Sequence, residues 1–288
     1  MSRHYEKLVI VGAPRSGTNM LRDALCALPG FVTWPCDEIN PIWKHGHLLS
    51  HPGDDLTSAQ ARPELSRFVR ARFDQLAADG VHTVVEKTCA TSVRVGYVRA
   101  LLPEARYVFT HRHGADAVAS AIARWTSSVE LSYTLRKVRY VPVVDLPVYG
   151  WRFVRNRIAQ RMDSQRRMKA WGPMTPAVAE AASAGDVVRA AAWQWRDCVE
   201  YSLDQLPAET VRVSYESFVA NPVSGMHDLL DGLNRSALVE GGVESAVSGV
   251  RADLAGRGIQ KLEKMGALDA VAEIINPTLD RLGYARVG

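Results

Sequence analysis

The chain has 288 residues, of which 47% are hydrophobic and 23% charged, and its formal net charge is +4. These values exclude a disordered or fibrous protein and are typical of one large globular domain. No apolar run approaches the ~20 residues that a transmembrane helix needs. Strand-like sequence begins too close to Met1 for a signal peptide, and four cysteines without CxxC spacing indicate a reducing compartment. We therefore expect one soluble, cytoplasmic domain over residues 1–288.

Short apolar runs alternate with helical patterns along the chain. Strand-like runs cover residues 8–11, 82–86, 106–110 and 210–214. Apolar residues at helical spacing cover residues 18–28, 65–78, 93–102, 115–125, 190–206 and 268–282, with Pro277 as an expected kink. This alternation predicts an α/β fold, a three-layer sandwich with a central parallel sheet. Residues 126–185 interrupt the alternation, and we expect an insertion or lid there instead of a separate domain.

The basic residues are concentrated in this interruption. Ten basic and two acidic residues lie between Arg136 and Lys169, so the rest of the chain carries a net negative charge. Such a stretch can attract an anionic ligand, and it can equally be a solvated helix face. The sequence leaves both interpretations open.

The first predicted strand is followed by the loop Gly12–Asn19 (GAPRSGTN), which leads directly into a helix. Ligands bind at the carboxyl ends of the strands in such sheets, and backbone N–H groups of this kind of loop can surround a phosphate. The glycine spacing is that of a nucleotide-binding P-loop, but Thr18 replaces its lysine and Asn19 its magnesium-binding hydroxyl. We therefore expect a P-loop-like site that binds phosphate without a metal, with Arg15 supplying positive charge. A tight turn without a ligand is the alternative.

A second anion site is predicted where the third strand ends. Arg112 follows that strand directly, and the next helix carries Ser120 and Arg124 four residues apart, on one face. Two arginines and a hydroxyl that converge at a strand end suit a second phosphate, although a lone arginine at such a place is more often structural.

The two segments together resemble the 3′-phosphoadenosine 5′-phosphosulfate (PAPS)-dependent sulfotransferase superfamily. Pro14–Thr18 is similar to its 5′-phosphosulfate loop, and Arg112, Ser120 and Arg124 are similar to its 3′-phosphate motif. The resemblance extends to residues 86–88, 213–216 and 275–284, and it is closest to the tyrosylprotein-like and bacterial carbohydrate sulfotransferase branch. It implies a transferase that uses PAPS as donor, releases 3′-phosphoadenosine 5′-phosphate (PAP) and needs no metal.

The general base is where the sequence departs from the cytosolic small-molecule members. Those members carry Lys-Thr-His, whereas the triplet here is Lys87-Thr88-Cys89, and Cys89 is better interpreted as a buried structural thiol. The other branches place a glutamate further along the chain from the phosphate loop, where this chain has Asp37-Glu38. The resemblance therefore implies Glu38 as the base and Asp37 as its reserve; a solvated acidic pair is the alternative.

Three histidines close to this pair could substitute for the glutamate. They are His45, His47 and His51, and they could also mimic a metal cluster, although their spacing is weak support for zinc.

The resemblance implies in-line sulfuryl transfer and assigns the remaining roles. Arg15 and Lys87 would neutralise charge on the transferring group, as electrostatic stabilisation requires. The donor would be held by the loop residues Ser16, Gly17, Thr18 and Asn19, by Arg112, Ser120 and Arg124 at its 3′-phosphate, by Tyr215 at adenine and, more weakly, by Lys261.

The acceptor and the rival functions are less well defined. We expect a hydroxyl of a small molecule, a carbohydrate or a glycosylated natural product, with a phenol or peptide tyrosine as second choice. A small-molecule kinase would need a lysine at position 18 and a hydroxyl at position 19, and the sequence has neither. A non-catalytic anion or nucleic-acid binder could use residues 136–169, but no nucleic acid is expected as partner. The sequence does not indicate an oligomeric state.

Overall fold

The computed structural model describes residues 4–51, 53–126, 141–147, 151, 171–239, 241–251 and 255–288. Its five strands form one parallel sheet with the order β2-β3-β1-β4-β5. They are β1 (Glu6–Val11), β2 (Phe31–Val32), β3 (Thr83–Lys87), β4 (Arg106–His111) and β5 (Val211–Ser214). The predicted parallel sheet is confirmed. The sequence did not indicate β2, because two residues are too few to show a pattern.

The register of the central strands brings four loops to one edge of the sheet. Ile10 of β1 pairs with Lys87 of β3, and Val11 pairs with Phe109 of β4. On the other side of β4, His111 pairs with Ser214. The segments that follow β1, β3, β4 and β5 therefore leave the sheet side by side at its carboxyl edge, where α/β proteins bind ligands.

All six predicted helices form, with small differences at their ends. The helices are α1 (Thr18–Cys26), α2 (Asn40–Trp43), α3 (Pro63–Asp74), α4 (Val95–Leu101), α5 (Gly114–Trp125), α8 (Pro176–Ser183), α9 (Val187–Gln205), α10 (Tyr215–Ala220), α11 (Pro222–Gly232), α12 (Val243–Val247), α13 (Gly258–Lys264) and α14 (Leu268–Leu282). Helix α14 continues through Pro277. None of the helices in the described ranges combines the length and the apolar character that spanning a bilayer requires.

The described part of residues 126–185 includes a helix that the sequence did not indicate. Residues 176–183 form the regular helix α8, which starts at Pro176 after the N-cap Thr175. The Thr175 hydroxyl accepts the N–H of Val178, so this end of the helix has a partner for one of its free donors. Most of the basic stretch 136–169 lies outside the described residues.

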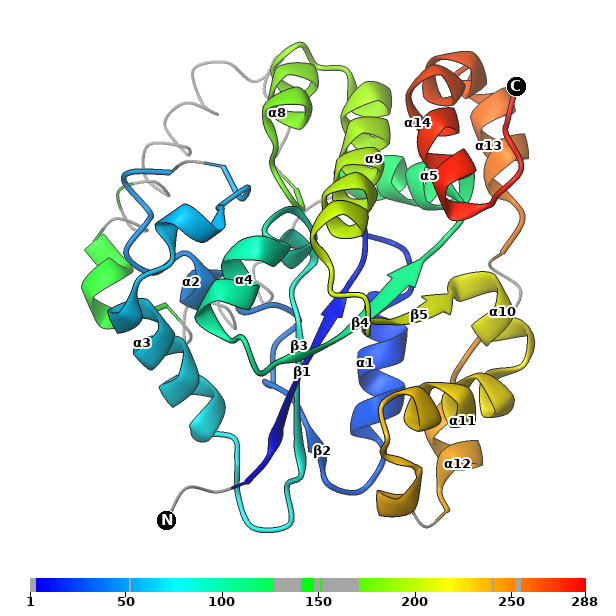
Figure 1. Cartoon of the computed structure of the whole chain (residues 1–288). Coiled ribbons are helices and arrows are strands. Elements are labelled where there is room, and N and C mark those ends of the chain that lie inside the picture. The colour runs from blue at the N-terminus through cyan, green and yellow to red at the C-terminus, as the bar shows by residue number, and fades with distance from the viewer. Residues whose placement is uncertain are drawn as a thin grey trace.

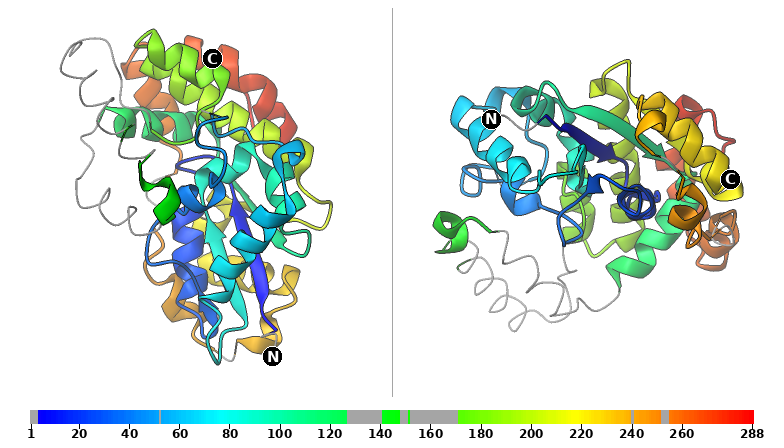
Figure 2. Two further views of the ribbon diagram at one scale, coloured as in Figure 1. Left: turned by 90° about the vertical axis from the view of Figure 1, so that its left-hand side faces the viewer. Right: turned by 90° about the horizontal axis from the view of Figure 1, so that it is seen from below.

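The side chains of the central strand divide the core into two halves. Leu8 and Ile10 pack against α1, α10, α11 and α12 on one face of the sheet. Val9 and Val11 pack against α3, α4, α5, α9 and α14 on the other face. All four side chains are fully buried, and burial of each contributes about 1.5–3 kcal/mol. The result is the predicted three-layer sandwich, with helices on both faces of the sheet (Figures 1 and 2).

Candidate functional site

A cavity of about 850 Å³ opens at the carboxyl edge of the sheet. This volume lies within the range of small-ligand sites. Most of the residues that the sequence singled out line it: Arg15, Gly17, Thr18, Asn19, Asp37, Glu38, Lys87, Arg112, Ser120, Arg124 and Tyr215. They come from four separate strand ends and from the segment after β2, and the fold brings them to one place.

The loop after β1 turns sharply where it leads into α1. Arg15 and Gly17 both have positive φ angles, 69° and 85°, and Gly17 is the N-cap of α1. At Gly12 the chain has no space for a side chain, because a Cβ there would lie 2.5 Å from the carbonyl oxygen of Thr110. The loop therefore lies close against β4, and the free N–H groups at the start of α1 lie at its end.

Tyr215 and Arg112 pack on this loop from the neighbouring strands. A Cβ at Gly17 would lie 2.6 Å from Cδ2 of Tyr215, so the ring lies directly against the loop. The Arg112 guanidinium is centred 4.3 Å from the Tyr215 ring centroid, and its Nη1 donates to the carbonyl oxygen of Arg15 at 3.2 Å. Both side chains are almost fully buried. Packing against the loop and against each other therefore holds both side chains in place.

Positive charge is concentrated at this end of the cavity. Arg15 donates from Nε to Ser120 Oγ at 2.9 Å, which links the β1 loop to α5. Burial lowers the pKa of Arg15, and the charges of Arg112 and Arg124 lower it further. Like charges are costly to hold together, so this cluster is a candidate anion site.

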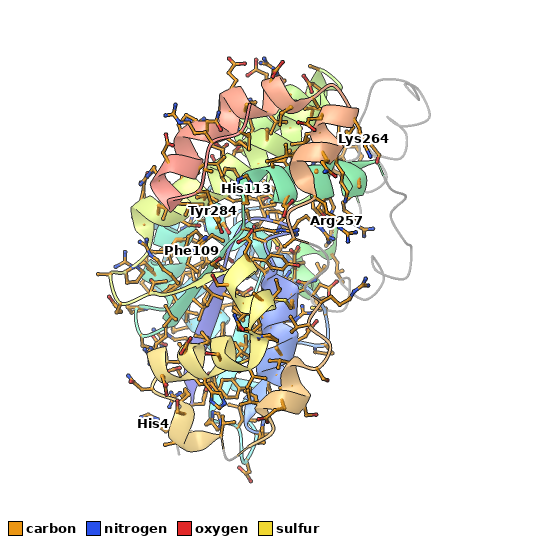
Figure 3. All side chains as sticks on the ribbon, turned by 90° about the vertical axis from the view of Figure 1, so that its right-hand side faces the viewer. His4, Phe109, His113, Arg257, Lys264 and Tyr284 are labelled. Atoms are coloured by element: carbon orange, nitrogen blue, oxygen red, sulfur yellow. The ribbon has the colours of Figure 1, made fainter. Side chains whose placement is uncertain are left out.

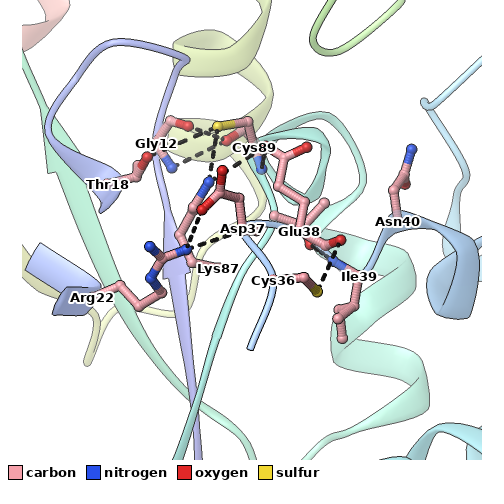
Figure 4. Close-up of polar contacts among 12 residues, drawn as sticks. Gly12, Thr18, Arg22, Cys36, Asp37, Glu38, Ile39, Asn40, Lys87 and Cys89 are labelled. Carbon is pink, nitrogen blue, oxygen red and sulfur yellow. Dashed lines mark hydrogen bonds and ion pairs between the residues drawn. The ribbon is translucent and has the colours of Figure 1, made fainter. Parts of the chain in front are cut away.

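The predicted base, Glu38, contacts the last residue of β3 and the segment that follows it (Figure 4). Its Oε1 accepts the N–H of Cys89 at 3.2 Å and lies 3.4 Å from Nζ of Lys87. The next residue, Ile39, donates its N–H to Thr88 Oγ1 at 3.1 Å. The carboxylate is 19% exposed and the Lys87 side chain 2% exposed, so the pair faces the cavity with limited access to solvent.

Burial has opposite consequences for the two groups beside Glu38. It raises the pKa of the Cys89 thiol to about 11, so the thiol stays protonated at neutral pH and cannot take a proton from a hydroxyl. For Lys87, burial works against the charged form, but the neighbouring Cys89 and Glu38 outweigh it and the pKa is raised. Lys87 therefore keeps its positive charge across the neutral range.

Asp37, the reserve candidate, has a different environment. Its Oδ1 lies 3.5 Å from Nη1 of Arg22, which also donates to the Asp37 carbonyl oxygen at 3.2 Å. The side chain is 44% exposed. Asp37 thus anchors the loop to α1, whereas Glu38 faces the ammonium group of Lys87.

Two of the residues that were predicted to hold the PAPS donor do not line the cavity. The Ser16 side chain is fully buried, and the backbone carbonyl oxygen of Ser16 accepts a hydrogen bond from the Thr110 hydroxyl at 2.9 Å. Lys261 is exposed on α13. That Ser16 and, more weakly, Lys261 hold the donor stays a prediction.

The three histidines do not converge. His45 Nδ1 lies 2.7 Å from Asp145 Oδ2, and His51 Nε2 lies 2.9 Å from Asp55 Oδ1. His47 is buried edge-on against Tyr97. Within the described ranges there is no group of three or more His, Cys, Asp and Glu side chains that could hold a metal.

The structure adds cavity residues that the sequence did not indicate. Trp171, Gly172, Gly249 and Arg251 line the same cavity. Asp54 holds the segment that follows Gly172, because its Oδ2 accepts the N–H of Met174 at 3.1 Å across 120 positions of sequence. A contact over such a distance leaves no local pattern, so sequence reasoning had no signal for this wall.

Comparison with known proteins gives one family and several solved structures. The sequence model of the Sulfotransferase family matches residues 7–160. In structure the chain is similar to sulfotransferase STF9 from Mycobacterium avium, with TM-score 0.48 and 15% identity over 99% of this chain and 78% of that one. It is also similar to the sulfotransferase domain from the curacin biosynthetic pathway, with TM-score 0.47 and 14% identity over 99% and 100%. For a sulfotransferase from Alicyclobacillus acidocaldarius, the TM-score is 0.44 and the identity 16%, over 90% of this chain and 95% of that one. No curated protein matches the sequence.

Proposed function

The chain belongs to the sulfotransferase family, and we propose that it transfers a sulfuryl group from PAPS to a hydroxyl group by in-line displacement. The observation that carries this proposal is one cavity lined by both the Glu38–Lys87 pair and the arginine cluster of Arg15, Arg112 and Arg124. A carboxylate base and a dense cationic surface are the two requirements of this reaction.

The described residues fit a donor that carries two separate anionic groups. Arg15, Gly17 and the first N–H groups of α1 would hold the 5′-phosphosulfate. Arg112, Ser120 and Arg124 would hold the 3′-phosphate. The Tyr215 ring, fixed between Gly17 and Arg112, would contact adenine.

Glu38 and Lys87 would act on the reacting groups. Glu38 takes the proton from the acceptor hydroxyl. The donor supplies a sulfuryl group, whose sulfur bonds to the acceptor oxygen as its bond to the 5′-phosphate oxygen breaks. Lys87 and Arg15 stabilise the negative charge that develops on that departing oxygen. Cys89 keeps its proton and takes no part in the transfer.

The same cavity is poorly suited to Mg·ATP. The P-loop of a kinase presents a lysine and a hydroxyl that binds magnesium, and positions 18 and 19 here are Thr18 and Asn19. The Thr18 side chain is buried, with its Oγ1 3.8 Å from Cys89 Sγ. We accordingly propose that Arg15 and Lys87 supply the charge without a metal.

For the acceptor we propose a hydroxyl of a carbohydrate, a glycosylated natural product or another small molecule. The support is the part of the cavity wall that comes from residues far from the donor loop in the sequence. There Trp171 offers an aromatic face and Arg251 a cation. Aromatic faces and hydrogen-bonding cations suit sugar rings that carry hydroxyl or acidic groups. The choice between these acceptors and a phenol rests on a transfer assay with radiolabelled PAPS against a panel of both kinds.

Isothermal titration tests the donor. We expect the protein to bind PAP tightly and independently of magnesium, and to bind ATP weakly with or without magnesium. A preference for Mg·ATP would overturn the proposal in favour of a kinase.

A further inference from the structure

Asp116, in the first turn of α5, makes three hydrogen bonds that the proposed chemistry does not use. Its Oδ2 accepts from Nη2 of Arg112 at 3.3 Å and from the N–H of Gly256 at 2.6 Å. Its Oδ1 accepts from the N–H of Gly258 at 2.5 Å. The side chain is almost fully buried. One carboxylate thus joins Arg112 to a segment 140 positions further along the chain.

The segment and α5 fit together without spare space. A Cβ at Gly258 would lie 2.4 Å from the backbone nitrogen of Asp116 and 2.5 Å from the carbonyl oxygen of Ala115. Figure 3 labels Arg257, where the segment passes α5 and leads into α13. Shortly before this contact in the sequence, Arg251 lines the cavity. The attachment at Asp116 therefore lies next to a part of the chain that contributes to the cavity wall.

We infer that Asp116 is a positioning residue, which couples recognition of the donor's 3′-phosphate by Arg112 to the placement of residues 255–258. The inference rests on the proposed role of Arg112. Asp116 holds Nη2 of Arg112 while the Arg15 carbonyl oxygen holds Nη1. The guanidinium is thus oriented before the phosphate arrives, which lowers the entropic cost of binding.

Positioning and simple electrostatics predict opposite results at this residue. A negative charge beside Arg112 repels a phosphate, so its removal alone would strengthen phosphate binding. Asparagine has the same shape as aspartate but replaces one acceptor oxygen with an NH₂ group, which cannot accept from Arg112, Gly256 or Gly258. If Asp116 positions these groups, Asp116→Asn weakens 3′-phosphate binding despite the more favourable charge.

The test is titration of the wild type and Asp116→Asn with PAP and with ADP, which lacks the 3′-phosphate. We expect Asp116→Asn to weaken PAP binding about 10- to 100-fold, as for lost hydrogen bonds to charged groups, with ADP binding nearly unchanged. Glu263→Gln is the matched control, because it removes the same charge from an exposed position on α13. PAP binding to Asp116→Asn that equals or exceeds that of the wild type would overturn the inference.

Gly258→Ala gives a second test that leaves every charge in place. Its methyl group would push the segment away from the backbone of α5, so we expect the same selective loss of PAP affinity. Unchanged PAP affinity in a folded Gly258→Ala variant, checked by circular dichroism, would contradict the coupling. A wild type that binds PAP and ADP equally would overturn the proposed donor as well, whereas wild-type selectivity with unaffected variants would overturn the coupling alone.

Discussion

The carboxylate of Glu38 lies 3.4 Å from the ammonium group of Lys87, although the two residues are 49 positions apart in the sequence. The same oxygen accepts the N–H of Cys89, so two donors at the end of one strand hold the carboxylate (Figure 4). A carboxylate held in this way has a fixed orientation, which is the geometric condition for efficient proton transfer in the proposed role of Glu38 as base.

Glu38→Gln should lower kcat about 100- to 10,000-fold, the usual contribution of a general base. PAP affinity should change little, because the variant keeps the shape of the side chain. Radiolabelled sulfate transfer and PAP titration measure the two quantities. Asp37→Asn is the matched comparison. Because Asp37 is paired with Arg22, this variant should retain most of the wild-type turnover. If Asp37→Asn loses activity and Glu38→Gln does not, the base is Asp37.

Arg112→Ala should weaken PAP binding far more than ADP binding. Of the groups of the donor, the guanidinium would contact only the 3′-phosphate directly, so ADP should lose only the smaller effect of the contacts that Arg112 makes with Tyr215 and Arg15. For PAP about 10- to 100-fold is expected, as for a charged hydrogen-bonded pair. Arg67→Ala, at an exposed position of α3, serves as control for the general loss of positive charge. Equal losses for PAP and ADP would remove the 3′-phosphate role from Arg112.

Cys89→Ala should retain turnover and leave the pH profile between pH 6 and 8.5 unchanged, since the thiol of the wild type is protonated there. Burial raises its pKa from the ordinary 9.0 to about 11, so the folded state favours the neutral thiol. That contribution to stability is complete below pH 9 and is lost as pH rises through about 11. Between pH 8 and 11 the unfolding temperature should therefore fall less steeply for Cys89→Ala than for the wild type. If the pH profile of kcat lost its alkaline limb in Cys89→Ala, the thiol would instead have a catalytic role.

Gly17→Ala should reduce PAP affinity as well as stability. Its φ of 85° costs about 1–2 kcal/mol for a residue with a Cβ, and the methyl group would also displace the Tyr215 ring. Gly80→Ala has nearly the same φ, 82°, with no atom within 4 Å of the added carbon. Both variants should lose similar backbone stability in thermal unfolding, and only Gly17→Ala should bind PAP less tightly. Equal PAP affinity in the two variants would show that the Tyr215 contact is dispensable.

Local patterns in the sequence predicted the central sheet and the position of the glycine-bearing loop after β1. Residues 8–11 read as a buried strand because each of them is apolar, and all four are buried in the structure. The turn at Gly12–Asn19 was recognisable because it needs glycine where the backbone approaches β4 or takes a positive φ. Helix α8 was missed, because half of its residues are alanines and its sequence has no strong apolar stripe.

The sequence by itself determined which residue types follow each strand, since strand periodicity and loop glycines act over a few neighbouring residues. Only the tertiary structure decided which of them meet. It brought Glu38 to Lys87, attached Gly256 and Gly258 to Asp116, and placed Trp171 and Arg251 in the same cavity wall. These contacts depend on how the strand ends align and how distant segments pack on them, and such packing leaves no trace in the local order of residues.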